Sequence, residues 1–121
     1  MSRAQVKISA LVAACALFVC ACAVGKGAGA VEAASRELFK SRCAVCHGED
    51  GLGRQVGEMR AQSLKNESAL AMTEDRMVQW VKRGSGDMPS FAASLTNEQI
   101  RGVVRHVRKN IQGLCRLTTM P

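Results

Sequence analysis

The feature that most constrains this chain is Cys43-Ala44-Val45-Cys46-His47, in which a histidine directly follows the second of two cysteines. One short turn can present both thiols to the vinyl groups of a haem while the next side chain reaches the iron. A CxxC pair alone would also fit a redox disulfide or half of a zinc site. A thioredoxin-like disulfide requires a strand before the motif, and no strand pattern precedes it here. A zinc site requires two further ligands, and the only other candidates outside the signal are His106 and Cys115, which form no second CxxC pair. The motif therefore predicts one covalent haem c, held by Cys43 and Cys46 with His47 on the iron.

The first thirty residues have the order of a secretory signal. Two basic residues precede an uncharged apolar run at positions 8–24, and small residues follow it. A small-x-small cleavage site, Ala28-Gly29-Ala30, lies directly before the first helical pattern. We therefore expect residues 1–30 to be a cleaved signal peptide and residues 31–121 to form one exported domain in the periplasm.

Three alternatives to this cleavage remain open. An earlier small-x-small site lies at Ala21-Cys22-Ala23. The apolar run of 17 residues is at the lower edge of the ~17–25 that span a bilayer, so it could be retained as a membrane anchor. Val12-Ala13-Ala14-Cys15 resembles a lipoprotein cleavage box, but little apolar sequence precedes it.

Composition and charge narrow the function further. The domain of 91 residues would contain few aromatic side chains, since the whole chain has three Phe, one Trp and no Tyr, so a buried cofactor would help to fill its core. The net charge of +7 falls to +4 after cleavage, because residues 1–30 hold three basic residues and no acid. No basic stripe with interleaved aromatics predicts nucleic-acid binding.

Some remaining charges and one cysteine have two interpretations each. A basic rim could steer an acidic redox partner, although solvated surface charge explains it equally well; its members would be Arg42, Arg54, Lys82 and Arg83. Cys115 would be the one cysteine outside the motif after cleavage, either buried or free to pair with another chain.

Helical periodicity appears before the motif and in two later segments. A first helix is predicted over 33–43, with Ala34, Leu38 and Phe39 on its apolar face. Residues 54–70 show no clear period, and we expect irregular structure there that includes at most one short helix. No strand pattern appears anywhere, so the predicted fold class is all-α.

The two later helices have well-defined ends. Thr73 as N-cap and Gly84 as C-cap bound a helix over 74–83. Its apolar face would comprise Met77, Trp80 and Val81. The capping-box pair Thr96 and Gln99 begins the last helix. Its apolar face would comprise Ile100, Val103, Val104, Val107 and Ile111, with Leu95 packing on Ile100 as a hydrophobic staple.

Met88 is the strongest candidate for the second axial ligand. It lies on a loop between Gly86, which allows close backbone approach, and Pro89, which restricts the chain direction. The other candidates are Met59, Met72, Met77, Met120 and His106. Met77 falls on an apolar helix face, and His106 within the last helix is interpreted as a packing or surface residue.

Four segments occur in the order found in a known family. They are Leu38-Phe39, the cysteine motif with Asp50-Gly51-Leu52-Gly53, Met88-Pro89-Ser90-Phe91, and Leu95-Thr96-Asn97-Glu98-Gln99-Ile100 leading to Val107-Arg108. On these segments the chain resembles the class I monohaem c-type cytochromes over about residues 33–109. The resemblance implies a cytochrome c fold of three to four helices around one haem c, with Phe39 where the first and last helices cross. It also implies covalent attachment at Cys43 and Cys46, His47 as proximal ligand and Met88 as distal ligand.

The chain departs from this family at two places. Many members have an aromatic residue where His106 falls, so the helix crossing is expected to pack differently. Many also have a proline after the motif whose carbonyl orients the proximal histidine, and none lies between Cys46 and Met88 here. Another carbonyl should therefore accept from Nδ1 of His47. Trp80 is placed to pack on the haem or meet a propionate, or simply to fill the core.

With both axial positions occupied, the iron has no vacant site for substrate or oxygen. We therefore expect a monomeric one-electron carrier rather than an enzyme, which shuttles electrons between redox proteins and contacts no membrane once its signal is removed. The alternatives are a haem-bearing subunit of a dehydrogenase or oxidase complex, and a haem enzyme or sensor in which Met88 leaves the iron open.

Overall fold

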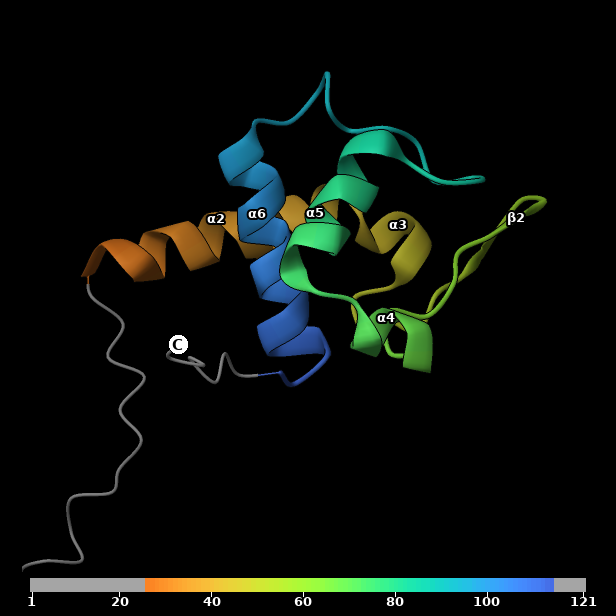
Figure 1. Cartoon of the computed structure of the whole chain (residues 1–121), viewed down its shortest axis with the longest axis horizontal. Helices are drawn as coiled ribbons and strands as arrows, with labels where there is room; N and C mark the ends of the chain where they lie inside the picture. The colour runs from red at the N-terminus through yellow and green to blue at the C-terminus, as the bar shows by residue number, and fades with distance from the viewer. Residues whose placement is uncertain (1–25, 115–121) are drawn as a thin grey trace, which may run out of the picture.

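The computed structural model describes residues 26–114, which form a small and mostly helical domain (Figure 1). In chain order its elements are α2 (Lys26–Arg42), α3 (Ala44–His47), β1 (Gln55–Val56), β2 (Met59–Arg60), α4 (Glu67–Ala71), α5 (Glu74–Arg83), α6 (Asn97–His106) and the π-helical turn η1 (Val107–Ile111). The predicted helical class is confirmed. Most of the predicted signal, together with Cys115 and Met120, lies outside the described residues. None of the helices within 26–114 is long and apolar enough to cross a membrane.

The first and last long helices cross, as the resemblance implied, and Phe39 lies at their contact (Figure 1). Phe39 on α2 is 2% exposed, and its ring centroid lies 5.6 Å from that of His106 on α6. Ser35 and Gly102 also meet here, because a Cβ on Gly102 would collide with the Ser35 hydroxyl. The buried apolar core consists of Phe39, Ala44, Met77, Val78, Ile100, Val103, Val104 and Val107.

Helix α2 begins earlier than predicted, and its buried face differs from the predicted one at Ala34, whereas Phe39 is buried and Leu38 packs on the core as expected. It starts at Lys26 rather than at residue 33, although Gly27 and Gly29 lower the helix propensity of this first turn. Ser35 is buried, whereas Ala34, which was expected on the apolar face, is exposed. A helix that crosses its partner buries a short patch instead of a full stripe, so the apolar period alone overestimates the contact.

His106 occupies the helix crossing as a buried side chain, which confirms its predicted packing role. Its Nδ1 lies 2.9 Å from Oε1 of Glu32, and Nδ2 of Asn110 donates to the same oxygen at 2.6 Å. The hydrogen bond from His106 lowers the pKa of Glu32, although partial burial of the carboxyl acts in the opposite direction. A polar cluster thus stands at the crossing where the resemblance led us to expect different packing.

Replacement of Glu32 by glutamine is expected to make the fold less sensitive to acid. Because the pKa of Glu32 is lowered in the folded state, its contribution to stability is complete above the ordinary value of 4.5 and is lost as pH falls through the lower folded value. The carboxyl is about one-third exposed, so we expect a difference of only roughly 0.5–1 kcal/mol at pH 6 and a smaller one at pH 3. Guanidinium unfolding of parent and Glu32→Gln at both pH values measures it. A difference independent of pH would contradict this expectation.

The predicted caps delimit α5 and α6. Helix α5 spans 74–83, as the sequence predicts, and its N-cap Thr73 accepts a backbone hydrogen bond within the first turn. Both hydrogen bonds of the capping box between Thr96 and Gln99 are present at the start of α6. Local capping chemistry therefore sets these helix ends in the way the sequence indicates.

The sequence pattern predicts neither the β-hairpin nor the π-turn. Gln55 pairs with Arg60 and Val56 with Met59, so the expectation of no strand is wrong in this segment. Each strand has two residues, too few to show an alternating period. The last helix also does not continue as α-helix to Ile111 but ends in the π-turn η1. A single wider turn leaves no signature in the apolar pattern of the sequence.

Candidate functional site

One cavity of about 600 Å³ brings together the residues that the sequence singles out. Its lining includes Phe39, Cys43, Cys46, His47, Trp80 and Met88. These side chains come from α2, α3, α5 and the loop after α5, and are separated by up to 49 positions in the chain. The loop before residue 91 and the β1–β2 hairpin project on the same side of the molecule, and both contribute to the cavity (Figure 1).

The cysteine motif is held by the end of α2. The backbone N–H of Cys43 donates to the carbonyl of Phe39 at 2.8 Å, and that of His47 donates to the carbonyl of Cys43 at 2.9 Å. The motif thus forms the short helix α3 directly after α2. Burial, with a smaller contribution from Cys46, raises the pKa of the Cys43 thiol to about 11. This thiol is therefore protonated at neutral pH.

His47 is oriented by the backbone carbonyl of Gln62. Nδ1 lies 3.2 Å from this oxygen. Since a carbonyl only accepts, Nδ1 must carry the proton, and the lone pair of Nε2 is free to bind a metal. Burial lowers the pKa of His47, partly offset by the hydrogen bond to Gln62, and so favours the neutral ring that ligation requires. The carbonyl that sequence analysis could not name is thus that of Gln62.

The segment that carries Gln62 is fastened to the loop after the motif. Two backbone hydrogen bonds join them: the N–H of Ala61 donates to the carbonyl of Arg54 at 3.0 Å, and that of Leu64 to the carbonyl of Gly51 at 2.7 Å. The loop is in turn bound to the motif, because Gly53 donates to His47 at 2.7 Å and Arg54 to Cys46 at 2.8 Å. Gly53 has a φ of +81°, and a Cβ there would collide with the carbonyl oxygen of Ala61 and stand 2.9 Å from the carbonyl carbon of Gln62. The position of the histidine's acceptor therefore depends on a residue without a side chain. A backbone carbonyl has no sequence signature of its own, because every residue carries one. Gly53 is the sequence feature that indicates a close backbone approach here.

Gly53→Ala is expected to destabilise the protein more than Gly57→Ala does. Both glycines have positive φ, but a Cβ at Gly57 meets nothing within 4 Å. The two variants share the left-handed strain, so their difference isolates the collision with the 61–62 backbone. We expect this difference to be roughly 1–3 kcal/mol, measured by guanidinium unfolding of the haem-bound protein. If both variants lose the same free energy of unfolding, the 61–62 backbone moves aside for the Cβ without an energetic cost, and this expectation is wrong.

The loop that carries Met88 is held by its own backbone. Ser85 and Met88 exchange hydrogen bonds of 3.0 Å in both directions, and the N–H of Phe91 donates to the carbonyl of Val81 at 3.1 Å. Gly84 permits this close return, because a Cβ there would lie 2.5 Å from the Met88 carbonyl oxygen. Met88 therefore stands on a short, well-fixed loop at the cavity.

The structure also brings other methionines to the cavity. Its lining includes Met59 on β2, Met72 before α5 and Met77 on α5. Met77 is 8% exposed and belongs to the core, as predicted. His106 does not line the cavity, and Met120 lies outside the described residues. Met59 and Met72 therefore line the same cavity as Met88, and the sequence pattern did not predict this.

Trp80 lines the cavity but is not part of the buried core. It is 40% exposed, whereas its neighbour Val78 is 1% exposed and fills the core position. Simple core filling is therefore the wrong interpretation of Trp80. The indole lies at a margin of the cavity, where it can contact a bound group and solvent together.

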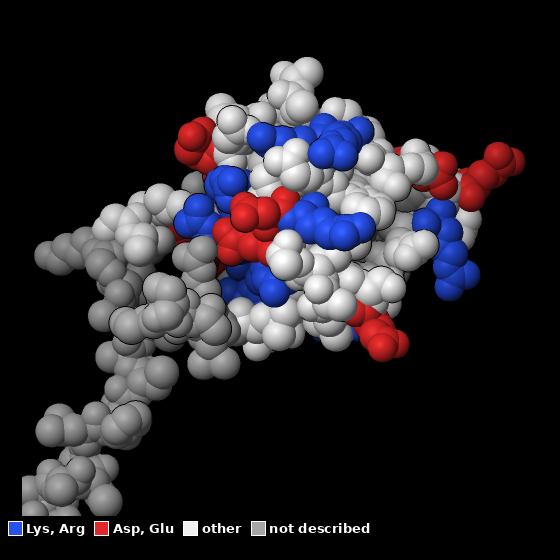
Figure 2. Space-filling model, in the orientation of Figure 1, with Lys and Arg blue, Asp and Glu red and all other residues white. Residues whose placement is uncertain are grey.

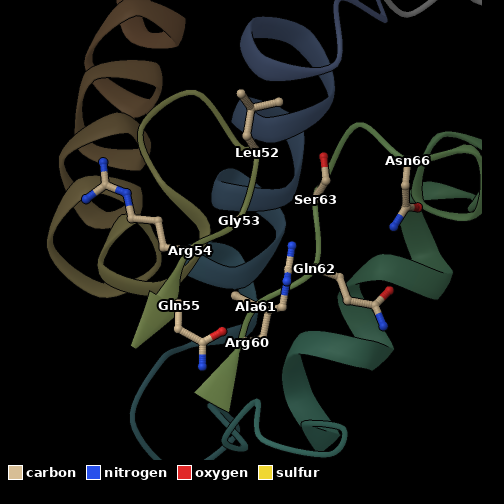
Figure 3. A pocket seen from close by; sticks show the side chains of 9 residues that line it. All are labelled: Leu52, Gly53, Arg54, Gln55, Arg60, Ala61, Gln62, Ser63 and Asn66. Atoms are coloured by element: carbon tan, nitrogen blue, oxygen red, sulfur yellow. The ribbon is translucent and has the colours of Figure 1, made fainter. Parts of the chain in front are cut away.

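A polar pocket of about 690 Å³ adjoins the first cavity (Figure 3). Arg60 and Gln62 line both spaces, while Arg54 lines only this pocket and points away from Asn66. Of the predicted basic rim, Arg42 lines the main cavity, but Lys82 and Arg83 line neither space. Figure 2 shows Lys and Arg side chains interspersed with Asp and Glu on the viewed face, not a single basic patch.

Comparisons with known proteins identify the class to which this fold and site belong. A solved structure, the KustC0563 c-type cytochrome, matches with a TM-score of 0.55 at 24% identity, covering 66% of this chain and 95% of the other. The fold is thus that of a c-type cytochrome. Residues 30–107 match the family described as "Cytochrome C oxidase, cbb3-type, subunit III".

Curated relatives agree with this class. Cytochrome c6 of Parathermosynechococcus lividus is 36% identical over 74 residues, which are 59% of this chain and 80% of the relative. Cytochrome c6 of Leptolyngbya boryana is 35% identical over 78 residues, 62% of this chain and 87% of the relative. The chain belongs to the cytochrome c and cbb3 subunit III family, as a monohaem c-type cytochrome related to cytochrome c6 and an electron carrier. Membership implies a covalently bound haem c.

Proposed function

We propose that this protein is a periplasmic one-electron carrier with a closed, six-coordinate haem c. Cys43 and Cys46 form the two thioethers, His47 is the proximal ligand and Met88 the distal ligand. The observation that carries the proposal is that Met88, 41 positions after His47, lines the same cavity as the three motif side chains, and that Gln62 leaves Nε2 of His47 free.

The cavity fits a haem in size and in chemistry. Its volume of about 600 Å³ lies within the range of roughly 300–1,000 Å³ usual for cofactor sites. Phe39, Val103, Val104 and Val107 provide an apolar wall, and the donors are two thiols, an imidazole and a thioether. Nitrogen and thioether sulfur are a known axial pair for haem iron.

The protein's own residues would keep the site closed. The fixed Met88 loop and the His47–Gln62 hydrogen bond hold two donors without need for rearrangement, so an electron can pass with little movement of the chain. The bound haem supplies the redox couple, and a thioether ligand favours its ferrous state. The apolar wall excludes water, and a site without water also favours the ferrous haem, which carries one positive charge less than the ferric haem.

We propose export with cleavage after Ala30 and a monomeric mature domain. Gly27 to Val31 are exposed, and the side-chain bonds that tie α2 to α6 begin at Glu32, so cleavage would leave the helix crossing intact. A retained anchor remains the alternative. Redox partners with acidic docking surfaces would suit Arg42 and Arg60 at the cavity, and no nucleic-acid role is proposed.

Absorption spectroscopy of the haem-bound protein tests the proposed ligands. We expect the ferric protein to show the weak near-infrared sulfur-to-iron band, and the ferrous protein to resist carbon monoxide. Absence of the band together with rapid binding of carbon monoxide would show an open site. The protein would then be a haem enzyme or sensor rather than a shuttle.

A second candidate function rests on the family match, whose description is that of an oxidase subunit. In that case the domain would deliver electrons within a stable complex instead of diffusing between partners. Purification from the native membrane and soluble fractions under mild conditions separates the two. Stoichiometric recovery with larger redox subunits supports the subunit, and recovery as a monomer supports the shuttle.

A further inference from the structure

The π-turn at the end of the last helix directs two polar side chains toward the segment around α4. The N–H of Gln112 donates to the carbonyl of Val107 at 2.8 Å, an i to i+5 bond that widens the last turn. This changes the phase of the helix, and the side chains of Arg108 and Gln112 both reach backbone carbonyls between residues 64 and 72. π-turns of this kind are frequent at functional sites.

Gln112 binds one carbonyl before α4 and one within it. Its Nε2 donates to Leu64 at 2.8 Å and to Ala69 at 3.3 Å. Because both partners are acceptors, the orientation of the amide is determined, and Oε1 is left buried with no hydrogen-bond partner in residues 26–114. A methionine of similar size would fill this space without an unpaired acceptor. We therefore attribute the presence of glutamine at position 112 to the two hydrogen bonds that its Nε2 donates, and not to its packing volume.

Arg108 secures the far end of the same segment. Its Nη1 donates to the carbonyl of Met72 at 2.7 Å and lies 3.6 Å from the sulfur of Met77. Helix α4 has five residues and ends at the C-cap Met72, whose N–H donates to the carbonyl of Ala69 at 3.3 Å, while its own carbonyl accepts from Arg108. The two side chains from the C-terminal turn thus supply donors to the exposed end of α4.

The bond to Leu64 leads directly to the histidine. Leu64 is two residues beyond Gln62, and its own N–H donates to Gly51 in the loop after the cysteine motif at 2.7 Å. Leu64 is therefore held by the motif loop on one side and by Gln112 on the other. The carbonyl of Gln62 that accepts from His47 lies within this doubly held stretch.

We infer that Gln112 is a positioning residue for His47, acting through Leu64 and the carbonyl of Gln62. The inference rests on the proposed role of His47 as axial ligand. A well-placed acceptor fixes the ring orientation and raises the basicity of a metal-bound histidine. Loss of Gln112 should let the 62–64 stretch move away, weaken this hydrogen bond and expose the Nδ1 proton to solvent.

The test compares Gln112→Met with Thr96→Ala in the full haem-bound chain. Methionine keeps the volume and removes both donors, whereas Thr96→Ala destabilises the fold by removing the N-cap of α6, whose hydroxyl accepts from Gln99 and not from the 62–64 stretch. The readout is solvent exchange of the His47 Nδ1 proton, followed by NMR in the ferrous protein. We expect exchange at least about tenfold faster in Gln112→Met than in Thr96→Ala, accompanied by a changed reduction potential.

Each outcome decides the question. Exchange no faster in Gln112→Met than in Thr96→Ala would overturn the role of Gln112 while leaving His47 as ligand. If the parent protein lacks the ring-current-shifted signals of a haem-bound histidine at His47, the ligand assignment is wrong and the inference falls with it. Should Gln112→Met not fold, Gln112→Asn, whose shorter amide cannot reach both carbonyls, must show the same faster exchange.

Discussion

Replacing Cys43 and Cys46 together by serine will abolish covalent haem attachment. The two thiols lie on the cavity, and neither serine can form a thioether. Haem should therefore separate from the polypeptide in denaturing electrophoresis, while the parent protein keeps its haem stain. We also expect the variant to lose most of its fold, because eight buried apolar residues form a small core beside a cavity of about 600 Å³. Far-UV circular dichroism measures this loss.

Cys115→Ser is the matched control, since it removes a thiol outside the motif. It should retain covalent haem and full helicity. Haem that remains on the double variant through denaturing electrophoresis would overturn the attachment proposal. A folded, haem-free double variant would instead show that the helices do not depend on the cofactor.

Met88→Ala will keep the haem attached but open its distal side. The thioethers and His47 are untouched, so haem should remain on the polypeptide. Without the thioether sulfur the near-infrared band should disappear, and the ferrous protein should bind carbon monoxide. Loss of a ligand that favours the ferrous state should lower the reduction potential, by a sizeable part of the roughly 0.8 V range that axial ligands span. Potentiometric titration measures the shift.

The neighbouring methionines provide the controls for this variant. Met59→Leu and Met72→Leu remove the other two methionine sulfurs that line the cavity outside the buried core of residues 26–114. Both should keep the near-infrared band and resist carbon monoxide. If Met59→Leu loses the band and Met88→Ala keeps it, the distal ligand is on the hairpin, and the assignment to Met88 is wrong.

The helices that depend on local chemistry could be read from the sequence. The caps at Thr73 and at Thr96 with Gln99 satisfy backbone groups within one turn, so α5 and the start of α6 lie where predicted. The buried face of α2 could not be read in this way, because the angle at which it meets α6 decides that Ser35 is buried and Ala34 is not. The β1–β2 hairpin could not be predicted either, because strands of two residues are too short to show an alternating apolar pattern.

The sequence by itself determined the class of cofactor, since two cysteines and a histidine at this spacing lie within a few residues of one another in any fold. It also indicated the loop on which Met88 stands. Tertiary structure alone decided that the carbonyl of Gln62 orients His47, and that Gln112 holds this stretch in place. These contacts join residues 15 and 48 positions apart, and every residue carries a carbonyl. Only the packing of the chain selects which carbonyl faces the ring.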